Sequence, residues 1–137
     1  WGLPVPTPVA ARYRRAGLCY RADLITAELP VRRTLTQALQ QASLPNETWH
    51  AIGQCVGSLH ERGVQHADLN AHNLLVGASN DIYVLDFDRG RIRARGAWER
   101  AVLARLQRSL RKVTTDLPAE RFSEAHWQAL LAGAGAG

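Results

Sequence analysis

The sequence of 137 residues contains no methionine and no long run of apolar residues. A membrane-spanning helix needs roughly 18 consecutive apolar residues, so none is predicted. The first residues lack a basic stretch followed by an apolar run, so no secretory signal peptide is predicted. Because a gene product starts with methionine and this chain opens on Trp1, we expect an internal fragment or a processed chain.

Cysteine and lysine are scarce as well. Cys19 and Cys55 stand among apolar residues and form no C-x-x-C motif, which predicts buried free thiols in a reducing compartment. Lys112 is the only lysine, so arginine supplies almost all of the net charge of +5. A basic balance predicts an anionic partner, namely nucleic acid, a membrane surface or a phosphorylated substrate, unless the arginine content has no functional meaning.

The length allows one domain, and an apolar content of 46% allows a buried core. In the first part of the chain, β-branched and aromatic residues predict two strands, 9–14 and 19–29, that form a hairpin around a turn at 16–17. Thr34 is a predicted N-cap for a short helix over 35–42, because its side chain can accept a hydrogen bond from the first helical turn.

Helical and strand patterns alternate in the rest of the chain. Apolar residues at helical spacing predict a helix that Gly63 ends and a second, amphipathic helix over 97–112. Short apolar runs predict strands at 73–76 and 82–85, and residues 124–132 are predicted to form the last helix. The predicted fold class is therefore α+β, mostly helical with short β-hairpins.

One stretch carries an ordered set of chemically active residues. An H-x-D-L-x-x-x-N loop spans 66–73, and a predicted strand then leads to a D-F pair at 86–87. This order is typical of phosphoryl transfer, in which a carboxylate orients the attacking hydroxyl and Asn and Asp hold Mg²⁺ on ATP. We therefore assign Asp68 as the catalytic base and Asn73 and Asp86 as metal ligands.

Other residues near this stretch receive supporting roles or none. The imidazole of His66 is predicted to hydrogen-bond the loop backbone, and Phe87 is predicted to pack beneath the site. His72 is interpreted as a supporting loop residue, and His60 is given no role. The joint spacing of the motif favours this interpretation over one in which the two acids are turn residues and His66 belongs to the core.

The stretch resembles the C-terminal lobe of a protein-kinase-like fold. Residues 66–73 and 85–90, with 2–6, 20–24 and 106–110, are similar to the bacterial 3-deoxy-D-manno-octulosonic acid (Kdo) kinases of lipopolysaccharide synthesis. The resemblance implies an enzyme, a sugar kinase that uses ATP and Mg²⁺ to phosphorylate a Kdo hydroxyl on a lipid A precursor. It also implies a cytoplasmic protein in peripheral contact with the bacterial inner membrane, with no nucleic-acid partner.

The same resemblance divides the chain in two. Residues 1–30 correspond to an extended opening segment, the last strands of an N-terminal lobe and the hinge, and residues 31–137 correspond to the C-terminal lobe. Backbone groups of Glu28 and Leu29 would then bind adenine, with a plain edge strand as the alternative. No glycine-rich loop and no lysine precede this hinge, so the phosphate-binding half of the site is expected to be missing from this chain.

Basic residues follow the predicted metal ligand directly. Arginines alternate with other residues in this row: Arg89, Arg91, Arg93 and Arg95. In an extended segment their side chains project to one side, and arginine pairs bidentately with carboxylates and phosphates. We assign the row as acceptor-binding, with a solvated basic edge as the alternative. Arg105, Arg108 and Lys112 share one face of a predicted helix, for which a solvated face is preferred over contact with an anionic membrane.

Departures from the protein-kinase pattern favour a small-molecule or lipid acceptor over a peptide. Asp88 replaces the glycine of D-F-G, Asn70 stands where many protein kinases have lysine, and no A-P-E motif follows. Another small-molecule kinase, such as a heptose or aminoglycoside kinase, and a non-catalytic kinase-like binding domain stay open as alternatives. A metal-dependent hydrolase using His66, Asp68 and His72 ranks last, because the spacing is not that of a familiar zinc site.

Overall fold

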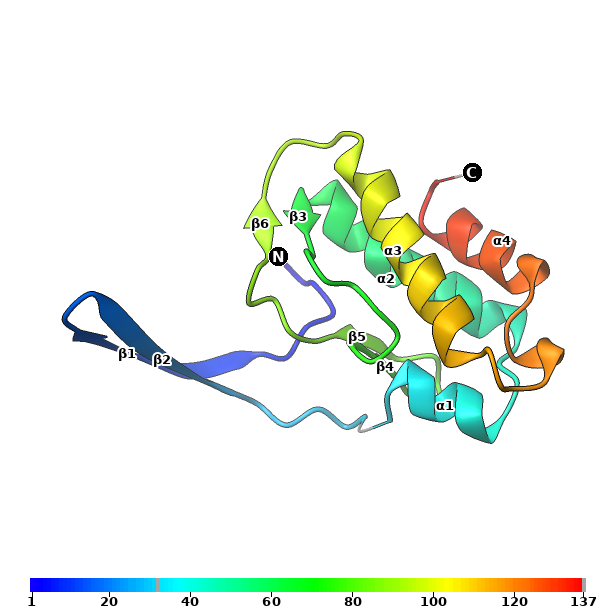
Figure 1. Cartoon of the computed structure of the whole chain (residues 1–137), viewed down its shortest axis with the longest axis horizontal. Helices are drawn as coiled ribbons and strands as arrows, with labels where there is room; N and C mark the ends of the chain where they lie inside the picture. The colour runs from blue at the N-terminus through cyan, green and yellow to red at the C-terminus, as the bar shows by residue number, and fades with distance from the viewer. Residues whose placement is uncertain (32, 137) are drawn as a thin grey trace.

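The structure is a computed structural model that describes residues 1–31 and 33–136, and the side chain of Ala16 is outside the description. Helices are combined with short antiparallel strands, so the chain is α+β, as predicted. A long hairpin extends as an arm from the helical part of the molecule (Figure 1). Within the described ranges, no helix combines the length and the apolar character needed to cross a membrane.

The arm consists of β1 (Pro8–Ala16) and β2 (Cys19–Thr26), paired antiparallel. The second strand ends three residues before the predicted end at 29, and every side chain on it is exposed. Cys19 is therefore exposed, so the prediction of a buried thiol is wrong for this residue. It is right for Cys55, whose pKa burial raises to about 12.

Helix α1 (Leu35–Gln41) begins where the sequence predicts. The backbone N–H of Gln37 donates to the Thr34 hydroxyl, and the Gln37 side chain accepts from the backbone N–H of Thr34. This capping box satisfies two backbone donors that have no partner within the helix. Leu35 and Leu39 are fully buried and attach the helix to the core.

Helix α2 (Asn46–Glu61) lies at the centre of the core. Its buried face carries the apolar residues that the helical spacing singles out: Trp49, Ile52, Val56 and Leu59. Gly63 follows the helix with φ 68°, and a Cβ at this position would overlap the carbonyl oxygen of Arg93. Both the backbone conformation and the lack of space therefore require glycine where the helix gives way to the next strand.

Two pairs of short strands frame the predicted motif. Strand β3 (Val64–Gln65) pairs with β6 (Arg91–Ile92), and β4 (Leu74–Val76) pairs with β5 (Ile82–Val84), both antiparallel. The sequence predicts the second pair to within one residue, whereas it does not predict the first. The loop between β3 and β4 and the segment between β5 and β6 carry the two halves of the motif, and the strand pairing brings them together.

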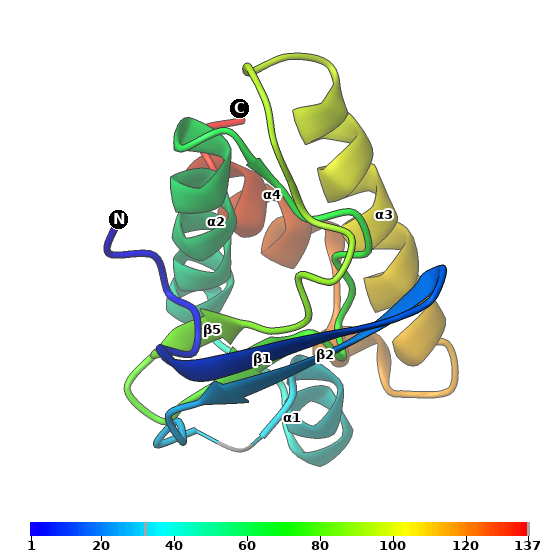
Figure 2. The ribbon, with the colours of Figure 1, turned by 90° about the vertical axis from the view of Figure 1, so that its left-hand side faces the viewer.

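Helix α3 (Trp98–Val113), a 3₁₀ turn (Ala119–Arg121) and helix α4 (Glu124–Gly133) complete the core. Helix α4 packs on α2 at a crossing where Gly53 and Gly133 leave no room for a Cβ. The two views show α2, α3 and α4 grouped on one side, with α1, β4 and β5 on the other (Figure 2). The loop between β3 and β4 lies against α3.

Candidate active site

His66 fixes the loop between β3 and β4. Its side chain is almost fully buried, its Nε2 donates to the carbonyl oxygen of Leu85 at 2.8 Å, and its Nδ1 accepts from the backbone N–H of Asp68 at 3.2 Å. These two contacts together require the neutral tautomer with its proton on Nε2. The Phe87 ring lies 4.8 Å from the imidazole, centroid to centroid. The imidazole therefore joins the loop to the segment that follows β5.

Asp68 occupies an exposed position on this loop. Its backbone oxygen accepts from the side-chain amides of Asn70 at 2.9 Å and Asn73 at 3.1 Å. Its Oδ1 accepts from Nη1 of Arg105 on α3 at 3.0 Å. Its Oδ2 has a longer contact of 3.4 Å with the Asn70 amide. The backbone of Asp68 is thus firmly held, while one carboxylate oxygen remains open to an incoming hydroxyl.

Asn70, which stands where many protein kinases have lysine, holds the shape of the loop through hydrogen bonds. Its Oδ1 accepts from the backbone N–H groups of His72 at 2.9 Å and Asn73 at 3.2 Å, an Asx-type turn. The next residue, Ala71, donates its backbone N–H to Oγ of Ser109 on α3 at 3.1 Å. His72 is exposed beside this turn. The loop is therefore held both internally and against α3.

Asp86 lies two residues after the end of β5, in the left-handed region of backbone space, with φ 62°. Asp and Asn tolerate this conformation better than most residues. The backbone N–H of Leu85 donates to the carbonyl oxygen of Asn73 at 2.8 Å. Asp86 is therefore adjacent in the chain to Leu85, whose backbone is hydrogen-bonded to that of Asn73. The two predicted metal ligands therefore lie at the same end of the β4–β5 pair.

The other predicted binding residues lie at separate places. Glu28 and Leu29 follow β2, where the arm joins the rest of the chain. Of the arginine row, Arg93 donates to Oε1 of Gln65 at 3.1 Å, and Arg95 pairs bidentately with a carboxylate on α3. Arg89 and Arg91 have exposed side chains. The four arginines thus do not act as one equivalent set in this structure.

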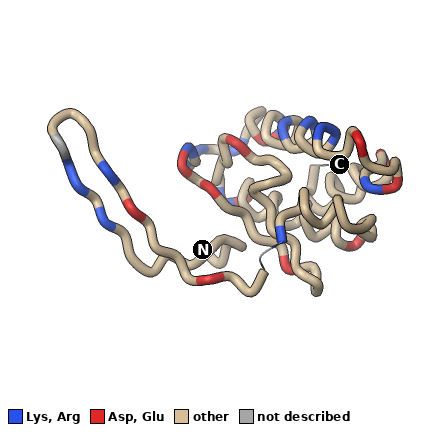
Figure 3. Tube along the Cα trace, turned by 60° about the horizontal axis from the view of Figure 1, so that its bottom comes forward, with Lys and Arg blue, Asp and Glu red and all other residues tan. Residues whose placement is uncertain are grey.

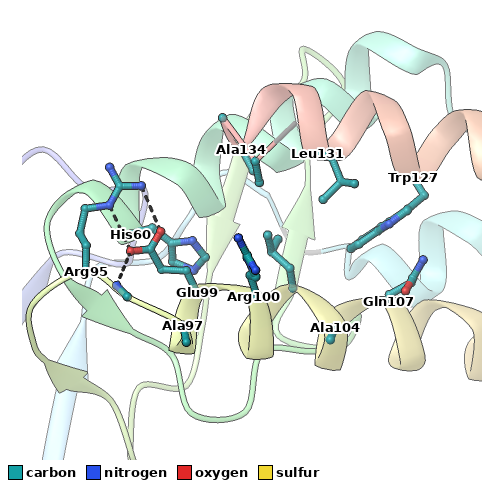
Figure 4. Close-up of a pocket in the computed structure, with 14 residues that line it drawn as sticks. His60, Arg95, Ala97, Glu99, Arg100, Ala104, Gln107, Trp127, Leu131 and Ala134 are labelled. Carbon is teal, nitrogen blue, oxygen red and sulfur yellow. Dashed lines mark hydrogen bonds and ion pairs between the residues drawn. The ribbon is translucent and has the colours of Figure 1, made fainter.

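A separate pocket of about 720 Å³ lies between α3 and α4 (Figure 4). The Arg95–Glu99 ion pair lies at one end beside His60, and Trp127 lines the pocket farther along. The His60 ring is buried and meets the Trp98 ring edge-on at 5.1 Å. Burial lowers the pKa of His60, and the nearby Glu99 carboxylate opposes this effect. No sequence pattern indicates this environment.

Comparison with known proteins places the chain in a family. The model of the lipopolysaccharide kinase (Kdo/WaaP) family matches residues 1–133. The chain belongs to this family. It is 42% identical over 132 residues to a protein named 3-deoxy-D-manno-octulosonic acid kinase from Photobacterium profundum. Proteins of the same name from Pasteurella multocida and Haemophilus influenzae are 41% and 38% identical over 136 residues.

Each of these three matches covers 96% of this chain but only 56% of the relative. The chain therefore spans about half the length of the curated relatives it matches. The resemblance to the Kdo kinases that the motif indicated is confirmed at the level of the family. In this family member, the residues between β3 and β6 form the best candidate for a reaction centre, because they combine an exposed carboxylate with a rigidly held loop.

The donor set of this family member suits magnesium. Asn73 and Asp86 offer an amide oxygen and a carboxylate, the hard oxygen ligands that Mg²⁺ prefers. Across residues 1–31 and 33–136, no cluster of three or more His, Cys, Asp or Glu side chains is arranged to hold a metal. Mg²⁺ is commonly held by one or two protein ligands together with substrate phosphates. The residues therefore fit a metal that arrives with a nucleotide.

Proposed function

We propose that this chain is the part of a Kdo kinase that carries the base and metal ligands for ATP-dependent phosphorylation of a Kdo hydroxyl on a lipid A precursor. The family membership and the names of the relatives support the activity and the acceptor. In this proposal residues 31–137 form a protein-kinase-like C-terminal lobe, and residues 1–30 form the last strands of the other lobe and the hinge. The glycine-rich loop and the phosphate-binding lysine belong to the remaining length of the longer protein.

The position of Asp68 is the observation that carries the proposal. Its backbone oxygen accepts from the side-chain amides of Asn70 and Asn73. Its Oδ2 has only a 3.4 Å contact with Asn70, so an acceptor hydroxyl can approach this oxygen from the solvent. Asp68 orients the acceptor hydroxyl and accepts its proton late in the transfer. His66 maintains the loop through its two hydrogen bonds to backbone groups. Because the hydroxyl is placed by a rigid loop, little reorganisation is needed as it attacks.

The remaining roles follow from the same arrangement. Asn73 and Asp86 would hold Mg²⁺, which neutralises charge on the phosphates of ATP. Backbone groups of Glu28 and Leu29 contact adenine, and Phe87 supports the segment beneath the site. The arginine row contacts the anionic acceptor, chiefly through Arg89 and Arg91, because Arg93 and Arg95 already donate to Gln65 and Glu99. Since that acceptor is an anionic glycolipid, the enzyme works in peripheral contact with the cytoplasmic face of the inner membrane.

The test is phosphate transfer by the full-length protein from labelled ATP to a Kdo-bearing lipid A precursor. We expect Asp68→Asn to lower kcat by at least about 100-fold, the usual contribution of a positioned base. Asp116→Asn removes an exposed carboxylate just after α3 and is expected to retain the wild-type rate. Wild-type turnover by Asp68→Asn would rule out Asp68 as the base.

A panel of acceptors tests the substrate. Transfer to a heptose or an aminoglycoside, and not to the Kdo-bearing precursor, would assign another small-molecule kinase. Mg²⁺-dependent nucleotide binding without transfer to any acceptor would instead indicate a non-catalytic kinase-like domain. We expect transfer to the Kdo-bearing precursor alone, because 38–42% identity to proteins named Kdo kinase extends over nearly the whole chain.

A further inference from the structure

The surface between the loop after β3 and helix α3 carries positive charge that the proposed chemistry does not use. A pocket of about 290 Å³ lies there, and residues of both elements line it, among them Asp68, Asn70, His72, Arg105, Arg108 and Lys112. Basic residues are gathered along α3 (Figure 3). Three cations and one carboxylate give this pocket a net positive charge.

The position of the cations on α3 does not stabilise the helix by itself. Arg105, Arg108 and Lys112 lie three and four residues apart on one face, where like charges destabilise a helix. The helix macrodipole favours cations only in the last turn, which includes Lys112 but neither arginine. A negatively charged ligand between the loop and the helix would relieve this repulsion.

The charges in the pocket are incompletely paired. Arg105 pairs with Asp68 at 3.0 Å. In the part of the chain that the structure describes, Arg108 and Lys112 have no acidic side chain within ion-pair distance. Arg105 therefore pairs with the proposed base, while two other cations of the same pocket lack a counter-charge. The bond from the Ala71 N–H to Ser109 Oγ holds the loop against α3 independently of this ion pair.

We propose that this pocket binds an anionic group of the acceptor, a carboxylate or a phosphate, with Arg108 and Lys112 as the binding residues. Arg105 links that group to Asp68. This inference rests on the proposed function at Asp68 and adds a second place, besides Arg89 and Arg91, where the charge of the acceptor is recognised. It replaces the interpretation of this helix face as merely solvated.

The geometry around Asp68 accommodates both groups of such an acceptor. Oδ1 is occupied by Arg105, and Oδ2 has only the 3.4 Å contact with Asn70. The hydroxyl can therefore approach Oδ2 while the anionic group lies on the side of Arg108. A guanidinium binds carboxylate or phosphate bidentately, which fixes the orientation of a sugar as well as attracting it. The pocket thus selects an acidic sugar over a neutral one.

Kinetics of the full-length protein with ATP and a Kdo-bearing lipid A precursor test this proposal. In the double variant Arg108→Ala/Lys112→Ala, we expect KM for the precursor to rise about tenfold or more, because a charge-assisted contact is lost. The KM for ATP should stay unchanged, and kcat should change less than KM for the precursor. Arg111→Ala, on the same helix but outside this pocket, is the matched control and should retain the wild-type KM.

Binding measured by calorimetry identifies the anion and separates the two proposals. Free Kdo supplies a carboxylate, and inorganic phosphate supplies a phosphate. We expect the wild-type protein to bind at least one of them and the double variant to lose that binding. If the anion binds through Arg108 and Lys112 but no precursor is phosphorylated, the proposed function is wrong and the pocket stands.

Two kinetic results would overturn the pocket. One is wild-type KM for the precursor in the double variant. The other is an equal loss of affinity in Arg111→Ala, which would indicate general attraction of a basic surface to an anionic membrane or micelle and no specific site. Failure of the wild-type protein to bind either free Kdo or inorganic phosphate would also overturn the proposal that the pocket recognises a carboxylate or a phosphate.

Discussion

His60 shows how burial controls the charge of a single residue. Its pKa is lowered by burial, so the folded protein binds a proton there less readily than the unfolded chain, whose value is about 6.5. The Glu99 carboxylate and the Arg95 guanidinium face this ring with opposite effects. The contribution of His60 to the free energy of unfolding is therefore complete above about pH 6.5, and it is lost as the pH falls toward and through the lowered pKa.

We predict that His60→Phe weakens this loss. Phenylalanine keeps an aromatic ring against Trp98 but takes up no proton. Urea unfolding at pH 7.5, 6 and 5 should show a smaller decrease in the free energy of unfolding for the variant than for the wild type. The exposed His50 on the same helix provides the control, since His50→Phe should leave the pH dependence unchanged. An identical decrease in His60→Phe and wild type would contradict the prediction.

Sequence and structure contribute different residues to the candidate site. Asp68, Asn73 and Asp86 could be singled out because their spacing around short strands reflects a local chain path. Arg105 could not, because 37 residues separate it from Asp68 and only the packing of α3 across the loop brings them together. The sequence shows that one face of this helix is basic, but it does not show which loop that face contacts.

Helices α2 and α4 cross at unusually short range. A Cβ on Gly53 would overlap the carbonyl oxygen of Leu130, and a Cβ on Gly133 would overlap that of His50. In an isolated helix, Gly53→Ala would be stabilising by about 1 kcal/mol. Here we predict that it lowers the free energy of unfolding by about 1–3 kcal/mol, because the helices must move apart.

Chemical denaturation measures this effect, and Gly96→Ala is its control. Gly96 precedes α3 without a positive φ, and the nearest atom to an added Cβ would be Trp98 Cδ1 at 3.9 Å. The control should therefore change stability by no more than about 0.5 kcal/mol. Increased stability in Gly53→Ala would show that helix propensity outweighs the close crossing.

The main elements could be predicted because their periodicities are strong. The capping box at Thr34 and the apolar stripe of α3 placed helix ends within one or two residues. The β3–β6 pair could not be predicted, since two residues carry no alternation and Gly63 and Arg93 meet only in three dimensions. The strand predicted over 19–29 was too long at its end, because the pairing with β1 stops at Thr26.

The molecule as a whole has two parts of very different burial. The helical part encloses an apolar core, whereas the arm exposes large apolar side chains by 61% or more: Val9, Tyr13, Leu18, Tyr20, Leu24 and Ile25. An isolated two-stranded hairpin is at best marginally stable in water, and apolar patches on proteins commonly mark a contact surface. These residues fit the proposed role of residues 1–30 as strands of a second lobe.

Hydrogen exchange tests this division between arm and core. In the 137-residue chain, backbone amides of β1 and β2 should exchange far faster than those of α2, since few packed side chains oppose opening of the arm. In the full-length protein we expect the same amides to become protected, because the proposed second lobe would add neighbours to the hairpin and cover its apolar side chains. The amides of α2 provide the internal reference in both proteins, since the helix is already buried in the core of this chain. Hairpin amides that exchange equally fast in the full-length protein would contradict the assignment of residues 1–30 to a second lobe, and would leave the exposed side chains free for another partner.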